Sequence, residues 1–118
     1  MLTRPKVLLH VEGAAVLAGA ALVYGLSGHS WLRFSLLFFV PDVSMLGYAG
    51  GPRLGAALYN LIHSYTLPLL ILAAVITQHR GDLMPYALIW LAHIGFDRML
   101  GYGLKYPTQF KDTHLGRV

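Results

Sequence analysis

Residues 54–77, LGAALYNLIHSYTLPLLILAAVIT, form one continuous apolar run without an aspartate, glutamate, lysine or arginine. The hydrocarbon core of a bilayer is ~30 Å thick, and an α-helix needs about 20 residues to cross it. This run is therefore long enough to form a transmembrane helix. Pro68 predicts a bend within it, because proline lacks a backbone N–H and its ring clashes with the preceding turn.

Three further apolar stretches accompany this run. They lie at about 7–26, 31–48 and 83–104. Polar or glycine-rich turns separate all four, and Pro41 predicts a kink in the second. The chain is 56% hydrophobic and only 12% charged, whereas a soluble domain carries about 25% charged residues. We therefore expect an all-α fold, with one domain at 1–118 built as a bundle of four transmembrane helices and a short polar tail at 105–118.

The basic residues indicate how these helices cross the membrane. Most of them belong to the N-terminus, the middle loop and the tail, which share one side of the bundle. They are Arg4, Lys6, Arg53, Lys105, Lys111 and Arg117. Because positive loops stay inside, both termini are expected in the cytoplasm. The net charge of +4 predicts lipid headgroups as partners and no nucleic acid, since the basic residues stand at the ends of apolar segments.

Five side chains that should avoid lipid lie inside the apolar stretches. They are Glu12, Asp42, His63, His93 and Asp97. Ionisable groups in a membrane span are costly unless they are paired, protonated or bound to something, so they mark a functional site. At 1.5 Å per residue, antiparallel helices bring all five to similar depths, about 8–16 Å from the cytoplasmic end. We therefore expect the five to converge.

The spacing of these residues favours a metal site. His93 and Asp97 are one helical turn apart, as Tyr59 is from His63, and Asn60 also shares the face of His63. Helical bundles build metal sites from imidazole and carboxylate groups on facing helices. The chain has no cysteine, so nitrogen and oxygen ligands would suit zinc first, with iron or manganese as alternatives. A buried ion-pair network that only orients the helices remains the competing interpretation.

Several motifs resemble a known family. They are Pro41-Asp42-Val43-Ser44-Met45-Leu46-Gly47-Tyr48, Tyr59-Asn60-Leu61-Ile62-His63 and His93-Ile94-Gly95-Phe96-Asp97-Arg98. The family is a group of bacterial membrane proteins catalogued as domain of unknown function 4260, which implies an inner-membrane location but no activity. More distantly, the order of Pro-Asp, a histidine helix and His-x-x-x-Asp is similar to YdjM-type membrane-bound metal-dependent hydrolases. That resemblance implies that Asp42, His63, His93 and Asp97 are metal ligands, and it leaves open whether they hold one metal or two.

These observations predict a metal-dependent membrane hydrolase that acts on a lipid or amphiphilic ester or phosphoester from the cytoplasmic leaflet. Glu12 would be the general base, Asn60 or Tyr102 would position the substrate, and Arg98 or Lys105 would meet an anionic headgroup. The tail residues Asp112 and His114 are either surface groups or, by the family resemblance, members of the site.

Two other functions remain open. Intramembrane carboxylates and histidines also form relays in proton- or ion-coupled carriers, although four spans would then require a homodimer. A non-catalytic adaptor would use the buried polar network to set helix register, with its basic tail docking a partner.

Overall fold

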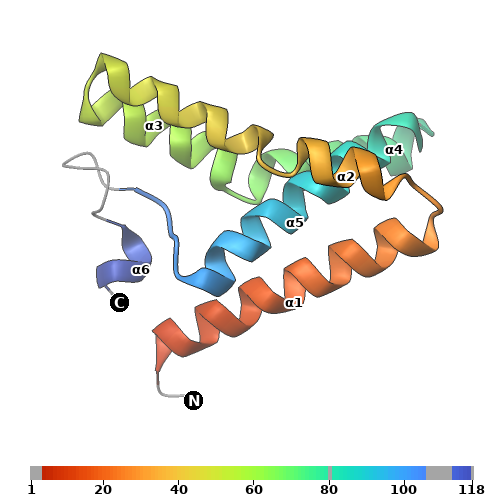
Figure 1. The fold of residues 1–118 in the computed structure, drawn as a ribbon, viewed down its shortest axis with the longest axis horizontal. Coiled ribbons are helices and arrows are strands. Elements are labelled where there is room, and N and C mark those ends of the chain that lie inside the picture. Colours follow the sequence, from red (N-terminus) through yellow and green to blue (C-terminus); the bar gives the residue numbers. More distant parts are fainter. Residues whose placement is uncertain (1–3, 80, 106–112, 118) are drawn as a thin grey trace.

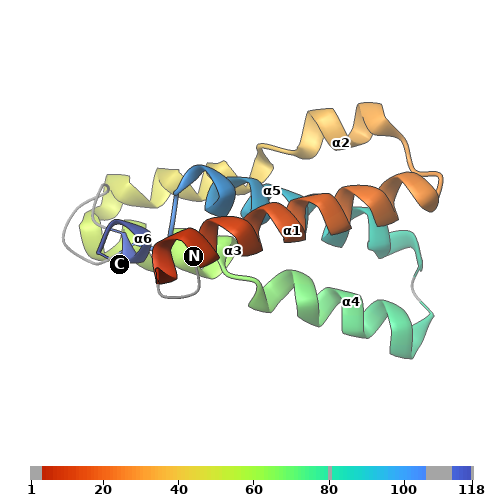
Figure 2. The same cartoon turned by 90° about the horizontal axis from the view of Figure 1, so that it is seen from below.

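The computed structural model describes residues 4–79, 81–105 and 113–117, and this part of the chain is helical without a β-strand. The elements in chain order are α1 (Pro5–Leu26), α2 (Trp31–Leu37), the 3₁₀-helix η1 (Val40–Gly50), α3 (Pro52–His63), α4 (Thr66–Gln78), the short 3₁₀-helix η2 (Gly81–Leu83), α5 (Met84–Leu100) and α6 (His114–Arg117). Figure 1 shows α5 running between α1 on one side and the η1–α3 pair on the other. Figure 2 shows α2 and α4 on opposite sides of α5.

Three helical segments are long and apolar enough to cross a membrane, which is consistent with a membrane protein. They are Pro5–Leu26, Trp31–Gly50 and Pro52–Gln78. The fourth predicted span, about 83–104, corresponds to α5, which stops at Leu100. Gly101 takes a left-handed φ of 98°, and its N–H caps the helix by bonding the carbonyls of Arg98 and Asp97. Helix α5 is thus about 26 Å long at 1.5 Å per residue.

Proline residues interrupt two of the segments. The predicted kink in the second segment is confirmed, because α2 ends at Leu37 and η1 begins at Val40 with Pro41 in its first turn. In the third segment, where a bend is expected near Pro68, the helix breaks between His63 and Thr66. The ring of a proline clashes with the carbonyl four residues earlier, here that of Ser64, so the helix restarts before Pro68 and not at it.

Helices α1 and α5 approach each other closely through two glycines. A Cβ atom placed on Gly13 would lie 2.8 Å from the carbonyl oxygen of Gly95, and one placed on Gly95 would lie 2.7 Å from the carbonyl oxygen of Gly13. Small residues allow such close backbone approach between membrane helices. The contact holds α5 against α1 at the level of His93 and Asp97, which lie on either side of Gly95 in the sequence.

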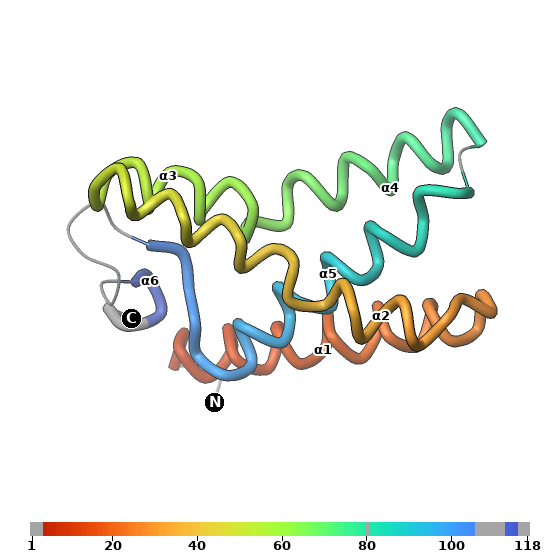
Figure 3. The backbone as a smooth tube through the Cα atoms, turned by 45° about the horizontal axis from the view of Figure 1, so that its top comes forward, coloured from red at the N-terminus to blue at the C-terminus, as the bar shows by residue number. Residues whose placement is uncertain are grey.

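Different segments of the chain lie at the two ends of the molecule. The N-terminus of α1, the turn between η1 and α3, and α6 all lie at one end, as Figure 3 shows. The turns that join α1 to α2 and α4 to α5 lie at the other end. The helices therefore alternate in direction along the chain. The side of a membrane that each end faces stays a prediction.

Candidate metal centre

Two aspartates and two histidines from three helical elements meet at one point. Asp42 lies in the first turn of η1, His63 is the last residue of α3, and His93 and Asp97 are one turn apart on α5. One ligand atom from each residue lies within 4.8 Å of the other three, so the group could hold a metal ion. Both imidazole side chains are 1% exposed, whereas Asp97 is 13% and Asp42 is 32% exposed.

The distances within this group resemble the edges of a coordination polyhedron. The Nε2 atoms of His63 and His93 are 3.2 Å apart, and they lie 3.2 and 3.1 Å from the same oxygen, Oδ1 of Asp42. Oδ2 of Asp97 lies 3.6 Å from Nε2 of His63 and 3.3 Å from Nε2 of His93. In a tetrahedral zinc site with bonds of ~2.0–2.1 Å, neighbouring ligand atoms are separated by about 3.3 Å.

The hydrogen bonding of His63 directs a lone pair into the group. Its Nδ1 lies 3.0 Å from the carbonyl oxygen of Tyr59, and because a carbonyl can only accept, Nδ1 carries the proton. In the neutral ring, Nε2 is then the free nitrogen. A backbone carbonyl commonly fixes a metal-binding histidine in this tautomer. At 3.2 Å the two Nε2 atoms cannot both carry a proton, so at least one lone pair points at the carboxylates.

This arrangement could hold a divalent cation. With at most one of the two rings protonated at Nε2, the histidines supply at most one positive charge to the carboxylates of Asp42 and Asp97, beside that of Lys105 in the same cavity. Uncompensated charge in a buried site is costly. A divalent cation would neutralise both carboxylates and accept both imidazole lone pairs, which is the ligand set expected for zinc, iron or manganese.

Local breaks in the helices place the ligands. Pro41 and Asp42 both lie in the first turn of η1, and the clash caused by Pro68 ends α3 so that His63 is its last residue. The shape of α5 accounts for the other two ligands, since positions four apart lie on one face. Trp90 holds the end of α3 against α5 by donating its indole N–H to the carbonyl of Ile62 at 2.6 Å.

Outer contacts support the two histidines. The ring of Tyr59 stacks on that of His63 with centroids 3.8 Å apart and planes at 6°. Nδ1 of His93 is buried and faces the backbone of Phe38 without a hydrogen bond of standard geometry. The role of Tyr59 was not predicted, although its position four residues before His63 is a signal for such stacking.

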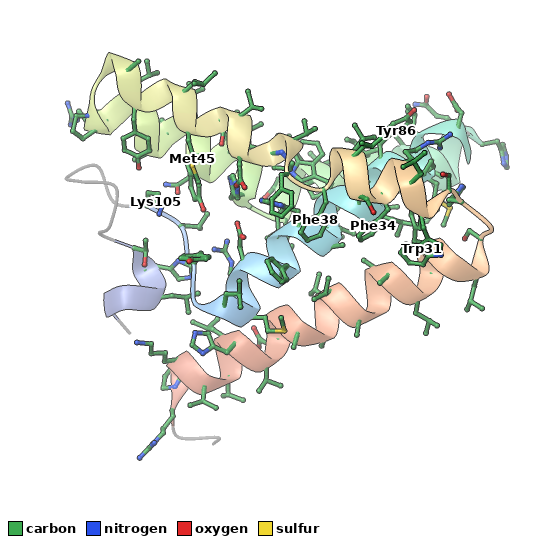
Figure 4. The ribbon with its side chains drawn as sticks, viewed as in Figure 1. Trp31, Phe34, Phe38, Met45, Tyr86 and Lys105 are labelled. Atoms are coloured by element: carbon green, nitrogen blue, oxygen red, sulfur yellow. The ribbon has the colours of Figure 1, made fainter. Side chains whose placement is uncertain are left out.

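A cavity of about 320 Å³ opens in front of Asp42 and Asp97. Its other walls are formed by Phe39, Met45, Tyr59, Phe96, Tyr102 and Lys105. Met45 and Lys105 both line it, and Figure 4 labels them on η1 and on the segment that follows α5. Three apolar side chains and one cationic side chain thus border the carboxylates. The apolar walls could not be predicted, because apolar residues in a membrane protein carry no signal that separates a cavity wall from a lipid contact.

Lys105 is placed in this cavity by Asn60. The side-chain amide of Asn60 donates to the carbonyl oxygen of Lys105 at 2.7 Å and accepts the Lys105 N–H at 2.5 Å. Nζ of Lys105 then lies 4.7 Å from the centre of the Tyr59 ring. Burial lowers the pKa of Lys105, and the charge of Asp97 opposes that shift. Both polar atoms of Asn60 are used on the backbone, so its placement favours a positioning role over the predicted contact with substrate.

Two other predicted site residues lie outside the cavity. Arg98 is buried, and its guanidinium donates to the carbonyl oxygens of His63 at 3.0 Å and Tyr102 at 3.2 Å. It therefore ties the end of α3 to the segment after α5. Glu12 lies on the exposed face of α1, so the expected convergence of five groups is wrong and four converge. Glu12 and Gly13 lie on different faces of α1, and α1 packs against α5 through the face with Gly13.

The tail packs back on the chain through His114. Nδ1 of His114 accepts the N–H of Leu104 at 2.7 Å, and the N–H of His114 donates to the carbonyl of Leu104 at 2.8 Å. An antiparallel β-bridge joins Lys105 to Thr113 beside it. His114 thus stabilises the segment that carries Lys105, and it is not one of the four converging residues. Asp112, the other tail residue singled out from the sequence, lies outside the described residues.

The contact of His114 predicts that the tail loosens in mild acid. Burial, followed by the charge of Arg98, lowers the pKa of His114 below its usual value. Stabilisation by the neutral ring is therefore complete above about pH 6.5 and is lost as the pH falls through that value toward the lower folded-state pKa. A lost hydrogen bond costs about 1 kcal/mol. We expect hydrogen exchange at Leu104 and Lys105, corrected for intrinsic rates, to accelerate severalfold between pH 7.5 and 5.5.

A matched variant tests this explanation. His114→Asn keeps a short side chain with an acceptor but removes the titrating group, so its exchange should not change with pH over the same interval. If wild-type exchange at Leu104 also stays constant, the contact does not stabilise the tail in the way described.

Comparison with known protein families adds one result. The profile of domain of unknown function 4260 (DUF4260) matches residues 6–118 of this chain. The chain belongs to this family. No curated protein and no solved structure matches it. The resemblance to YdjM-type hydrolases is therefore not supported by a match, and membership of the DUF4260 family assigns no activity to the four converging residues.

Proposed function

We propose that this member of the DUF4260 family is a membrane-embedded metal-dependent hydrolase of a lipid or amphiphilic ester or phosphoester. One observation carries the proposal: the Nε2 atoms of His63 and His93 and the carboxylates of Asp42 and Asp97 face one point beside a cavity with apolar and cationic walls. A structural ion-pair network needs no such cavity. Ionisable residues within membrane spans, when they are grouped in this way, are commonly functional.

Zinc is the ion that we propose for the site. The separations of 3.1 to 3.6 Å between its nitrogen and oxygen atoms agree with tetrahedral coordination, and two imidazoles with carboxylates are common zinc ligands. Iron and manganese accept the same donors and are the alternatives. Such an ion supplies Lewis acidity, since it lowers the pKa of a water molecule and polarises an ester oxygen.

The side chains around the cavity have distinct roles in this proposal. Lys105 attracts the negative charge of the substrate head, and Tyr102, which lines the same cavity, orients it. Asp42 is the more exposed of the two carboxylates, so the oxygen that it does not use as a ligand can accept a proton from the attacking water. That proton then passes to the leaving alcohol, and hydrolysis yields an acid and an alcohol. Asp42 thus replaces Glu12, which lies outside the cavity.

The location of the cavity supports access from the cytoplasmic leaflet of the bacterial inner membrane. Lys105 and Tyr102 follow the end of α5, toward the end of the molecule with the N-terminus and α6. Arg4, Lys6 and Arg53 belong to the same end, where the positive-inside rule predicts cytoplasm. A substrate head would therefore reach the metal site from the cytoplasmic interface.

Hydrolysis by zinc-loaded protein in vesicles tests the proposal. We expect turnover of at least one fluorogenic ester or phosphodiester lipid, and we expect Asp97→Asn to lower it at least about 100-fold, since Lewis-acid catalysis is worth several kcal/mol. His79→Asn is the matched control. His79 is exposed at the end of α4 with a left-handed φ of 53°, which asparagine tolerates. Zinc-loaded protein without turnover of any such lipid, or Asp97→Asn at the wild-type rate, would refute the hydrolase.

An ion- or proton-coupled carrier is the second candidate, favoured by the chain of close contacts from the partly exposed Asp42 to the buried histidines. Carboxylates and histidines in such chains relay protons. The carrier predicts a proton or ion flux in metal-free vesicles that Asp42→Asn abolishes. Hydrolysis without flux would decide for the enzyme.

A further inference from the structure

A second cavity of about 310 Å³ lies between α1 and α2. Leu17 of α1 forms one wall, and the other walls come from Phe34, Ser35, Phe38 and Phe39. Phe39 is also a wall of the cavity in front of the metal-binding group. The two cavities are therefore neighbours that share one aromatic side chain.

The packing of α2 explains why this space is open. Tyr24 holds the start of α2 to α1, with ring centroids 5.0 Å from Trp31 and 5.1 Å from Phe34, and its hydroxyl donates to the carbonyl of Ser30. Helix α2 has no fully buried residue. Figure 4 shows Trp31, Phe34 and Phe38 following one another along α2. Contact with α1 is thus concentrated at the turn, and the cavity lies beyond it, toward Phe38.

The two cavities differ in polarity. Among the described residues, the only polar side chain in the wall of the α1–α2 cavity is Ser35, and its hydroxyl already donates to the carbonyl of Trp31 at 3.0 Å. None of the charged side chains that the structure describes lines that cavity. The neighbouring cavity has the two carboxylates and Lys105. An apolar cavity remains dry and accepts hydrocarbon, whereas a charged one accepts a polar head.

We propose that the two cavities together bind one amphiphile, with an anionic ester or phosphoester head at Lys105 and the metal site and a hydrocarbon chain between α1 and α2. Hydrolysis of the head rests on the proposed function, whereas binding of the amphiphile does not. The chain enters laterally from the bilayer, because its cavity is bordered by residues of two membrane-spanning segments. Phe39 marks the boundary between head and chain: its ring centroid lies 5.1 Å from that of Phe38 and 6.3 Å from that of His93.

Photo-crosslinking tests this proposal without requiring turnover. The probe is dodecylphosphonate with a diazirine near the end of its chain, in phosphatidylcholine vesicles that contain zinc-loaded protein. Its P–C bond has no ester to hydrolyse. We expect crosslinks to concentrate at residues 34–39 and near Leu17. Leu17→Trp and Ser35→Trp fill the cavity, and each should lower this crosslinking at least about tenfold. Because Ser35 is exposed, its variant is expected to fold even if Leu17→Trp does not.

Leu36→Trp is the matched control. Leu36 is 70% exposed and lies on the side of α2 away from Phe34 and Phe38, so the same large side chain there should leave the crosslinks unchanged. Lys105→Gln tests the head, since it should weaken crosslinking by the phosphonate but not by the corresponding neutral alcohol. Crosslinks spread evenly over the exposed faces of α1 and α2, or insensitive to Ser35→Trp, would overturn the proposal.

Zinc content and hydrolysis are measured on the same vesicles, which separates this inference from the proposed function. If crosslinks concentrate at residues 34–39 and near Leu17, and Ser35→Trp lowers them, in protein that hydrolyses no lipid, the chain site is supported and the hydrolase is refuted. If the protein hydrolyses lipid but Ser35→Trp leaves the crosslinks unchanged, the proposed site for the hydrocarbon chain is refuted and the hydrolase is not.

Discussion

Zinc is expected to fall from close to one atom per chain in the detergent-purified wild type to near zero in both His63→Ala and His93→Ala. The two rings contribute the nitrogen atoms that lie 3.2 Å apart at the centre of the group. Structural zinc sites with four ligands bind with ~10–16 kcal/mol, so one ligand is worth about 3 kcal/mol. Its loss lowers affinity about 100-fold or more. Elemental mass spectrometry on folded, size-selected protein measures the outcome.

His79→Asn serves as the control for the loss of a histidine, because His79 is exposed and is not part of the group. It should retain wild-type zinc. A folded wild type that contains no zinc, iron or manganese and takes up none from added salts would show that the four side chains form a metal-free network. The carrier would then be the stronger candidate.

Gly13→Ala is expected to destabilise the protein by about 1–3 kcal/mol, the usual cost of overpacking. The added methyl carbon would lie 2.6 Å from the backbone nitrogen of Met99 and 2.8 Å from the carbonyl oxygen of Gly95, and backbone atoms cannot move aside as a flexible side chain would. Separating α1 from α5 would also displace His93 and Asp97. Unfolding in mixed micelles, followed by circular dichroism, measures the change in the free energy of unfolding.

Gly19→Ala is the matched control on the same helix. A Cβ atom at Gly19 meets nothing within 4 Å, and alanine is favoured over glycine in a helix by about 1 kcal/mol. This variant should be as stable as the wild type or more so. Equal stability of the Gly13 and Gly19 variants would mean that the α1–α5 contact is not as close as described.

Hydropathy predicted much of the fold. The three segments long and apolar enough to cross a membrane overlap three predicted spans, and the kink at Pro41 lies where it was expected. Helix α5 ends at Leu100, before the approximate limit of 104 expected for the fourth span, because Gly101 lies inside an apolar stretch and only its left-handed backbone stops the helix. The break near Pro68 falls before that residue, since proline disturbs the carbonyl four residues before it.

The four residues that converge were also predictable from the sequence. Asp42, His63, His93 and Asp97 stood out as ionisable residues in apolar surroundings, and helical spacing paired the last two. Glu12 satisfied the same criteria but does not lie with the other four residues. Depth along a helix follows from counting residues, whereas the direction in which Glu12 points depends on which face of α1 packs against α5, and two glycines decide that.

The sequence by itself determined that this is a helical, membrane-type chain with four candidate ligands, because hydropathy and helical spacing are local properties that can be counted along the chain. Only the tertiary structure decided what each polar group contacts. In it the amide of Asn60 hydrogen-bonds the backbone of Lys105, the buried Arg98 donates to the carbonyl of His63, and a cavity lies between α1 and α2. These contacts join residues far apart in the chain, and they depend on the rotation and separation of packed helices, which residue spacing does not encode.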